Sequence, residues 1–136
     1  MLIQTTDLQR IVDVGGSDIW HSLYSTVAVR LRKFTKTIPH ALKFLQLGRC
    51  PSSTAFATAR ELNLVRDALS QIRPEQAVYD KDDPDRVAPW SGNISGIVTS
   101  CGNMFLTADG KDLLYELVSI LAYAHYANVD VEPGEI

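Results

Sequence analysis

Four aspartates occupy one short stretch of the chain, DKDDPD: Asp80, Asp82, Asp83 and Asp85. Clustered carboxylates can bind a divalent cation or complement a basic partner. An EF-hand calcium loop does not fit, because Pro84 and Asp85 stand where that loop needs a ligand and its glycine, and the twelfth position holds no glutamate. We therefore expect a solvated acidic loop without a dedicated metal, with a weak cation site as the alternative.

Two further patterns suggest nucleotide or metal chemistry, and each lacks a required residue. Gly110-Lys111 is followed by Asp112, where a phosphate-binding loop needs Ser or Thr for magnesium. The three histidines fall on three different expected helices and have no metal-ligand spacing: His21, His40 and His125. The sequence therefore predicts neither a metal site nor a cofactor.

Cysteine chemistry stays open as an alternative. Cys50 or Cys101 could meet a histidine in space and act as the nucleophile of a small cytosolic hydrolase or transferase. No signature residue flanks either cysteine, so a protein without enzyme activity is the favoured interpretation. The N-terminus MLIQTTDLQR lacks the basic start and apolar centre of a secretory signal, so we expect a cytoplasmic protein with free thiols.

The composition is that of an ordinary globular domain. The 136 residues are 46% hydrophobic and 21% charged, and a domain commonly has about 100 to 150 residues. We therefore predict a single domain over residues 1–136. No run of about 18 apolar residues occurs, and this argues against a membrane segment.

Charge is divided unevenly along the chain. Residues 1–73 carry ten Lys and Arg against five Asp and Glu, whereas residues 74–136 carry three against eleven. Such asymmetry can steer a charged partner, unless folding interleaves the two halves. A basic cluster is formed by Arg30, Arg32, Lys33, Lys36, Lys43 and Arg49. Because the pI of about 5.5 is low for a nucleic-acid-binding domain, we interpret the cluster as the solvated side of two helices.

Apolar residues that recur at helical spacing predict four helices. Ser17 or Asp18 can cap the first, and Gly48 is a typical C-terminal residue for the second. Thr107 can cap the fourth, which Asn128 closes. The expected helices run from 17 or 18 to about 33, from 39 to 47, from about 52 to 73 and from about 108 to 127.

Short apolar segments predict four strands, at residues 8–14, 76–80, 103–107 and 129–133, of which the first is an edge strand. Four short strands are not stable alone. We therefore expect one small, mainly antiparallel sheet covered by helices, an α+β two-layer domain.

Three stretches occur in an order and spacing that resemble the bacterial immunity protein 70 family of polymorphic toxin systems: HSLYSTVAVRL (21–31), PWSGNIS (89–95) and NMFLTADGKDL (103–113). The resemblance extends from Trp20 to Val131, with Ser91 inserted where the family commonly has glycine directly after the tryptophan. It implies a cytosolic antidote, without enzyme activity, that binds and blocks a cognate secreted or contact-delivered toxin domain. A regulatory binding subunit is the alternative that differs only in its partner.

For such an antidote, the expected toxin-binding residues are Asp80, Asp82, Asp83, Asp85, Trp90 and Asn93. Clustered carboxylates can take the place of phosphate in the basic site of a nuclease toxin. Trp90 has two interpretations. It is either a partly exposed anchor for the toxin or a plug that Pro89 directs over the sheet.

Overall fold

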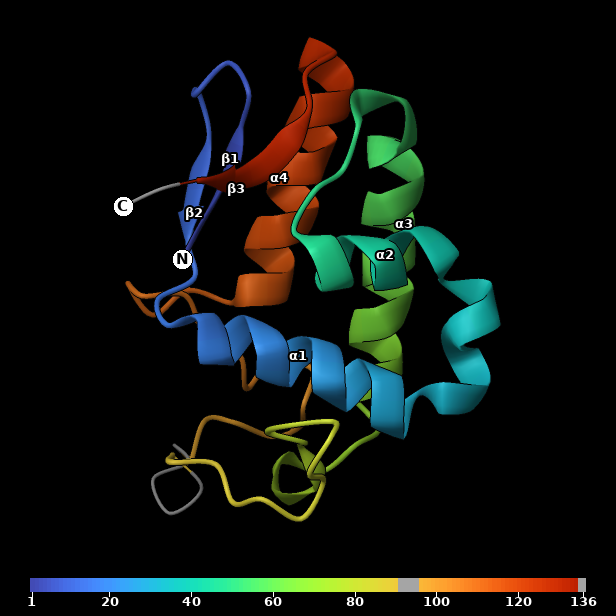
Figure 1. Ribbon diagram of the computed structural model, residues 1–136, viewed down its shortest axis with the longest axis vertical. Coiled ribbons are helices and arrows are strands. Elements are labelled where there is room, and N and C mark those ends of the chain that lie inside the picture. Colours follow the sequence, from blue (N-terminus) through green and yellow to red (C-terminus); the bar gives the residue numbers. More distant parts are fainter. Residues whose placement is uncertain (91–95, 135–136) are drawn as a thin grey trace.

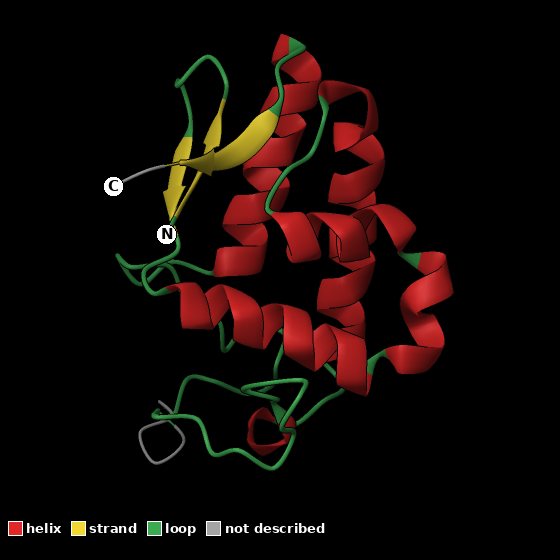
Figure 2. Ribbon diagram, viewed as in Figure 1, coloured by secondary structure: helices red, strands yellow, loops and turns green. Residues whose placement is uncertain are grey.

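The computed structural model describes residues 1–90 and 96–134 and has the predicted α+β architecture (Figures 1 and 2). A small antiparallel sheet lies at one end of a layer of helices, and a long irregular segment covers the other end. The elements are β1 (Leu2–Thr5), β2 (Ile11–Asp13), α1 (Ser17–Arg30), the 3-10 helix η1 (Arg32–Thr37), α2 (Pro39–Leu47), α3 (Ser52–Leu69), the 3-10 helix η2 (Pro74–Gln76), α4 (Leu113–Ala127) and β3 (Val131–Gly134).

The sheet has three strands in the order β2-β1-β3, one fewer than expected, and all its pairings are antiparallel. Its central strand, β1, was not predicted; Ile3 of β1 is fully buried and pairs with Val12 on one side and Pro133 on the other. The edge position of β2 is confirmed. The strand is shorter than expected because Leu8 adopts a left-handed φ of 59° in the turn that precedes it.

The four predicted helices are confirmed with small differences at their ends. The second runs from Pro39 to Leu47 as expected, and Gly48 closes it with a φ of 70°. Asn128 closes α4 in the same left-handed conformation. The N-terminal cap of α4 was wrongly assigned to Thr107: Asp112 accepts the backbone N–H of Tyr115 instead, so the helix begins several residues later.

The two predicted strands at residues 76–80 and 103–107 are wrong. The first begins at the end of η2 and continues as irregular chain, because α1 side chains take the hydrogen bonds of Val78. The second contributes an isolated bridge between Leu106 and Asp112, which closes a tight loop before α4. Both segments therefore satisfy their backbone groups locally or against a helix.

The core lies between the helices and beneath the sheet. Helix α3 packs along α4, and α4 also contacts all three strands. Trp20 of α1 is buried, donates from Nε1 to the carbonyl of Leu45 at 2.6 Å and meets Phe44 edge to face with ring centroids 5.5 Å apart. This first tryptophan is therefore a packing residue. No helix in the described part of the chain is long and apolar enough to span a membrane.

Candidate functional site

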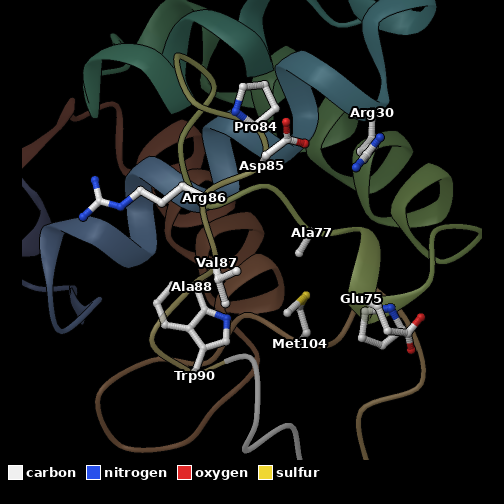
Figure 3. Close-up of a pocket in the computed structure, with 11 residues that line it drawn as sticks. Arg30, Glu75, Ala77, Pro84, Asp85, Arg86, Val87, Ala88, Trp90 and Met104 are labelled. Atoms are coloured by element: carbon white, nitrogen blue, oxygen red, sulfur yellow. The ribbon is translucent and has the colours of Figure 1, made fainter.

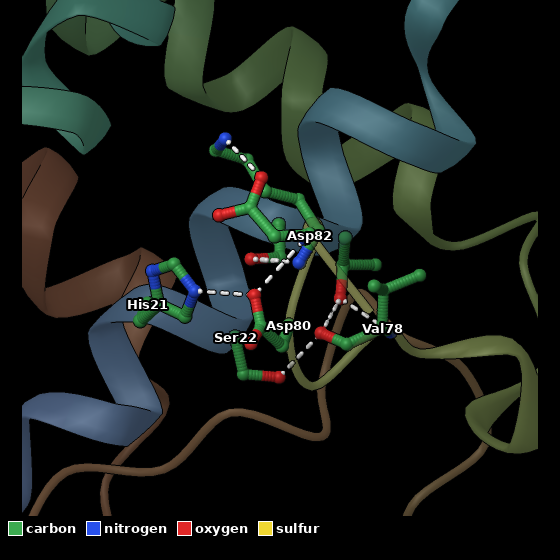
Figure 4. A network of polar contacts seen from close by, with 8 residues as sticks. His21, Ser22, Val78, Asp80 and Asp82 are labelled. Atoms are coloured by element: carbon green, nitrogen blue, oxygen red, sulfur yellow. Dashed lines mark hydrogen bonds and ion pairs between the residues drawn. The ribbon is translucent and has the colours of Figure 1, made fainter. Parts of the chain in front are cut away.

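The segment that carries the aspartates is fastened to α1 by hydrogen bonds at its start (Figure 4). Ser22 and Thr26 both donate to the carbonyl of Val78, at 2.8 and 3.2 Å, and the Val78 N–H donates back to Thr26 at 2.9 Å. The Lys81 N–H donates to the hydroxyl of Ser25 at 3.1 Å. Since these hydroxyls are buried on α1, the hydrogen bonds fix the position of the first residues of the loop on that helix.

Asp80 belongs to this fastening. Its Oδ1 accepts the Asp82 N–H at 3.0 Å and lies 3.2 Å from His21 Nε2 on α1. These contacts, the Asp82 N–H first and His21 second, lower the pKa of the Asp80 carboxyl. Asp80 is therefore used within the protein.

The carboxylates of the remaining aspartates have fewer contacts within the protein than that of Asp80. Asp82 is 3.1 Å from the ammonium group of Lys81. Asp83 and Asp85 are exposed, and their carboxylates have neither a hydrogen bond nor an ion pair within residues 1–90 and 96–134. The four predicted aspartates thus lie on one loop. The carboxylates of Asp83 and Asp85 are exposed to solvent and have no partner among the described residues.

Trp90 returns to the start of this loop. Its ring meets Tyr79 edge to face, with centroids 5.3 Å apart, and the indole is partly buried. Tyr79 in turn donates to Asp18 at 3.2 Å and carries the guanidinium of Arg86 5.2 Å from its ring centroid. Burial, followed by the hydrogen bond to Asp18, raises the pKa of Tyr79.

The expected plug over the sheet is wrong in its location. Trp90 packs on Tyr79, and the irregular segment that contains both residues lies at the end of the molecule away from the three strands (Figure 1). The partly buried indole keeps some surface available, as an anchor requires. Asn93, the other predicted binding residue of this stretch, lies outside the described residues.

A cavity of about 270 Å³ opens between this loop and η2. Figure 3 shows Val87, Trp90 and Met104 gathered on one side of it, with Asp85 and Arg30 on the other. The charged residues of its lining are two cations and two carboxylates: Arg30, Arg86, Glu75 and Asp85. An apolar wall with a charged rim suits a side chain from a protein partner.

Several residues of this site were missed by sequence reasoning. Tyr79 and Arg86 were missed although both directly flank the aspartates. Arg30 and Met104 come from distant segments and no local pattern marks them. The interleaving of an aromatic with the acidic run, YDKDDPD, was the signal that could have identified Tyr79.

The two cysteines have structural environments. Burial raises the pKa of Cys101 to about 11, and its thiol donates to the carbonyl of Arg73 at 3.3 Å. Cys50 is buried beside the hydroxyl of Thr58, with the sulfur and oxygen 3.4 Å apart. In the described part of the chain no histidine is hydrogen-bonded to either thiol: His21 contacts Asp80, His40 contacts Glu61 and His125 stacks on Phe56.

The structure is that of a small α+β protein with an acidic loop and a cavity at the end away from its sheet. The chain matches the family model described as Immunity protein 70 over residues 4–132, and it belongs to that family. Comparison with curated proteins and with solved structures gives no match.

Proposed function

We propose that this immunity protein neutralises a cognate bacterial toxin domain by direct contact, in the cytoplasm, through its acidic loop (residues 80–88), Trp90 and the adjoining cavity. The observation that carries the proposal is the meeting of free carboxylates, a partly buried indole and a cavity on one loop that is fastened to α1. Membership of the family supplies a toxin as the partner.

The chemistry of the loop indicates a basic toxin site. The carboxylates of Asp83 and Asp85 are uncommitted, so they can accept cationic groups at a modest desolvation cost. A nuclease, whose active site is built to hold phosphate, presents such groups. The toxin we propose is therefore a nuclease of a polymorphic or contact-dependent growth inhibition system.

The test co-expresses the cognate toxin domain with wild-type or variant immunity protein and titrates the two proteins in vitro. We expect Trp90→Ala to weaken binding about 30-fold or more, because a buried aromatic anchor is lost. The double variant Asp83→Asn/Asp85→Asn should slow association about 10-fold at low salt and change dissociation less.

Two control variants test whether the effects are specific to the acidic loop and Trp90. Tyr126→Ala removes an aromatic that is 89% exposed on α4, and Asp67→Asn/Glu116→Gln removes two carboxylates from α3 and α4. Both should leave toxin binding and protection of growth unchanged. If the Trp90 and aspartate variants protect fully, the toxin binds at another surface of the protein. If the wild-type protein does not protect, the proposed function is refuted.

A further inference from the structure

One continuous stretch of the chain carries only positive charge. Residues 19–60 contain no Asp or Glu, and they form most of α1, all of η1 and α2, and the first half of α3. This stretch contains seven cations: Arg30, Arg32, Lys33, Lys36, Lys43, Arg49 and Arg60. The positive charge of the N-terminal half of the chain is therefore concentrated in this stretch.

Few of these cations have partners elsewhere in the protein. Arg49 lies 4.0 Å from Glu132, and Arg30 donates to the carbonyl of Gln76. Five others are exposed and form no ion pair within the described residues: Arg32, Lys33 and Lys36 on η1, Lys43 on α2 and Arg60 on α3. We call the four on η1 and α2 the basic face. Unpaired like charges repel one another, so a surface of this kind gains from carboxylates that a partner supplies.

The basic face borders a shallow hollow of about 380 Å³ where α1 passes into η1. Its lining combines three apolar residues, Val29, Leu31 and Phe34, with three cations, Arg30, Arg32 and Lys33. A hollow that combines apolar surface with cations selects a segment in which carboxylates flank an apolar side chain.

The acidic loop of this same protein has that chemistry. Asp83 and Asp85 are free, and Val87, two residues further on, is 73% exposed. The loop lies alongside α1, and η1 extends from the C-terminal end of that helix (Figure 1). The N–H groups of Val78 and Lys81 donate to Thr26 and Ser25 and so hold the start of the loop on α1. A loop that enters the hollow therefore has to come from another molecule.

We propose that the basic face is a docking surface for a second copy of this chain, and that its occupant is the acidic loop of that copy. The two surfaces lie on neighbouring elements, so two molecules can exchange these contacts reciprocally in a two-fold dimer, the commonest symmetry of homo-oligomers. The contact is electrostatic and exposed, so the dimer is weak and dissociates as salt screens it.

The experiment measures the mass of the full chain by sedimentation between about 10 μM and 1 mM protein, in about 0.1 M and 1 M NaCl. We expect a concentration-dependent dimer whose dissociation constant rises at least about 10-fold at the higher salt. Lys33→Glu/Lys36→Glu and Asp83→Lys/Asp85→Lys should each be monomeric alone. An equimolar mixture of the two variants should form a dimer again, since each charge reversal then faces the other.

The control Arg73→Glu/Lys111→Glu makes the same change in net charge as Lys33→Glu/Lys36→Glu, on exposed cations outside the basic face, and it should dimerise like the wild type. Circular dichroism and an NMR amide spectrum of each variant verify the fold. Three results would each overturn the proposal. The wild type could be monomeric at every concentration, the dimer could persist in a charge-reversal variant, or the mixture of the two variants could stay monomeric.

This inference goes beyond the proposed function and is tested without the toxin. If both hold, one loop serves two partners, and the toxin must displace the second copy. A dimer without toxin binding, or toxin binding by a strict monomer, separates the two proposals.

Discussion

A single buried carboxylate organises the start of α2. Helix α2 has no side-chain cap from its own N-terminal segment, and Glu61 of α3 fills that role from across the interface. Glu61 Oε1 accepts the N–H groups of His40 and Ala41 at 2.8 and 3.2 Å, and Oε2 lies 2.7 Å from His40 Nδ1. Because the first N–H groups of a helix have no partner within it, this carboxylate satisfies donors that would otherwise be unpaired.

Replacement Glu61→Ala should therefore lower the free energy of unfolding by about 2–3 kcal/mol, because buried donors lose a charged acceptor. Urea unfolding followed by circular dichroism measures this change. The control is Glu75→Ala, whose side chain is 70% exposed and which should stay within about 0.5 kcal/mol of the wild type. Equal effects of the two substitutions would show that the contact with α2 is energetically unimportant.

At the scale of elements, side chains of helix α1 form the hydrogen bonds that a neighbouring strand would otherwise provide to the segment after η2. The backbone N–H and carbonyl of Val78 bond with the side chains of Ser22 and Thr26, so Val78 is buried without a neighbouring strand. This arrangement fastens the acidic loop, and through it the candidate binding site, to α1.

The variant Thr26→Val keeps the shape of the side chain but leaves the buried Val78 N–H without an acceptor. We expect it to lower the unfolding free energy by about 1–3 kcal/mol, and hydrogen exchange should show faster exchange at the Val78 amide. Thr37→Val, at an exposed threonine of η1, is the control and should change neither quantity. Unaltered protection of the Val78 amide would contradict the assigned role of Thr26.

The contrast between helices and strands explains what was predictable. Helices at 39–47 and 52–69 have an apolar periodicity that is local, so the pattern located them closely. Strands depend on partners distant in the chain: β1 needed both β2 and β3, and residues 76–80 look like a strand but found hydroxyl partners on α1. Tertiary context overrode strand propensity there.

The candidate site was predictable in composition only. The aspartates and Trp90 were identifiable from loop chemistry and sequence proximity. Asp80 differs from the exposed Asp83 because it accepts the Asp82 N–H and also contacts His21, which lies 59 residues away in the sequence. No local pattern could reveal the contact with His21. The basic face was visible in the sequence as a cluster of cations, but the lack of ion pairs between its four residues and the rest of the described chain could be read only from the structure.

At the scale of the whole molecule, a polar junction joins the N-terminal hairpin of the sheet to the last helix. Asp7, in the turn after β1, accepts the hydroxyl of Thr5 at 2.6 Å and that of Tyr123 on α4 at 2.7 Å. Arg10 of the same turn lies over the Tyr123 ring, 4.3 Å from its centroid. The junction connects residues 116 positions apart, so it closes the N-terminal hairpin onto the last helix.

The pKa of Asp7 gives this junction a pH dependence. The hydrogen bonds from Thr5 and Tyr123 lower the pKa of the Asp7 carboxyl in the folded protein. Its contribution to stability is therefore present above the unfolded pKa of about 3.9 and is lost as the pH falls through the lower, folded value.

Asp7→Asn should reduce the melting temperature near pH 7. The difference in melting temperature from the wild type should narrow in melts carried out progressively below about pH 4. Asp67→Asn, at an exposed position of α3, is the matched control; a gap for Asp7→Asn that stays constant with pH would mean that the charge of Asp7 does not stabilise the junction.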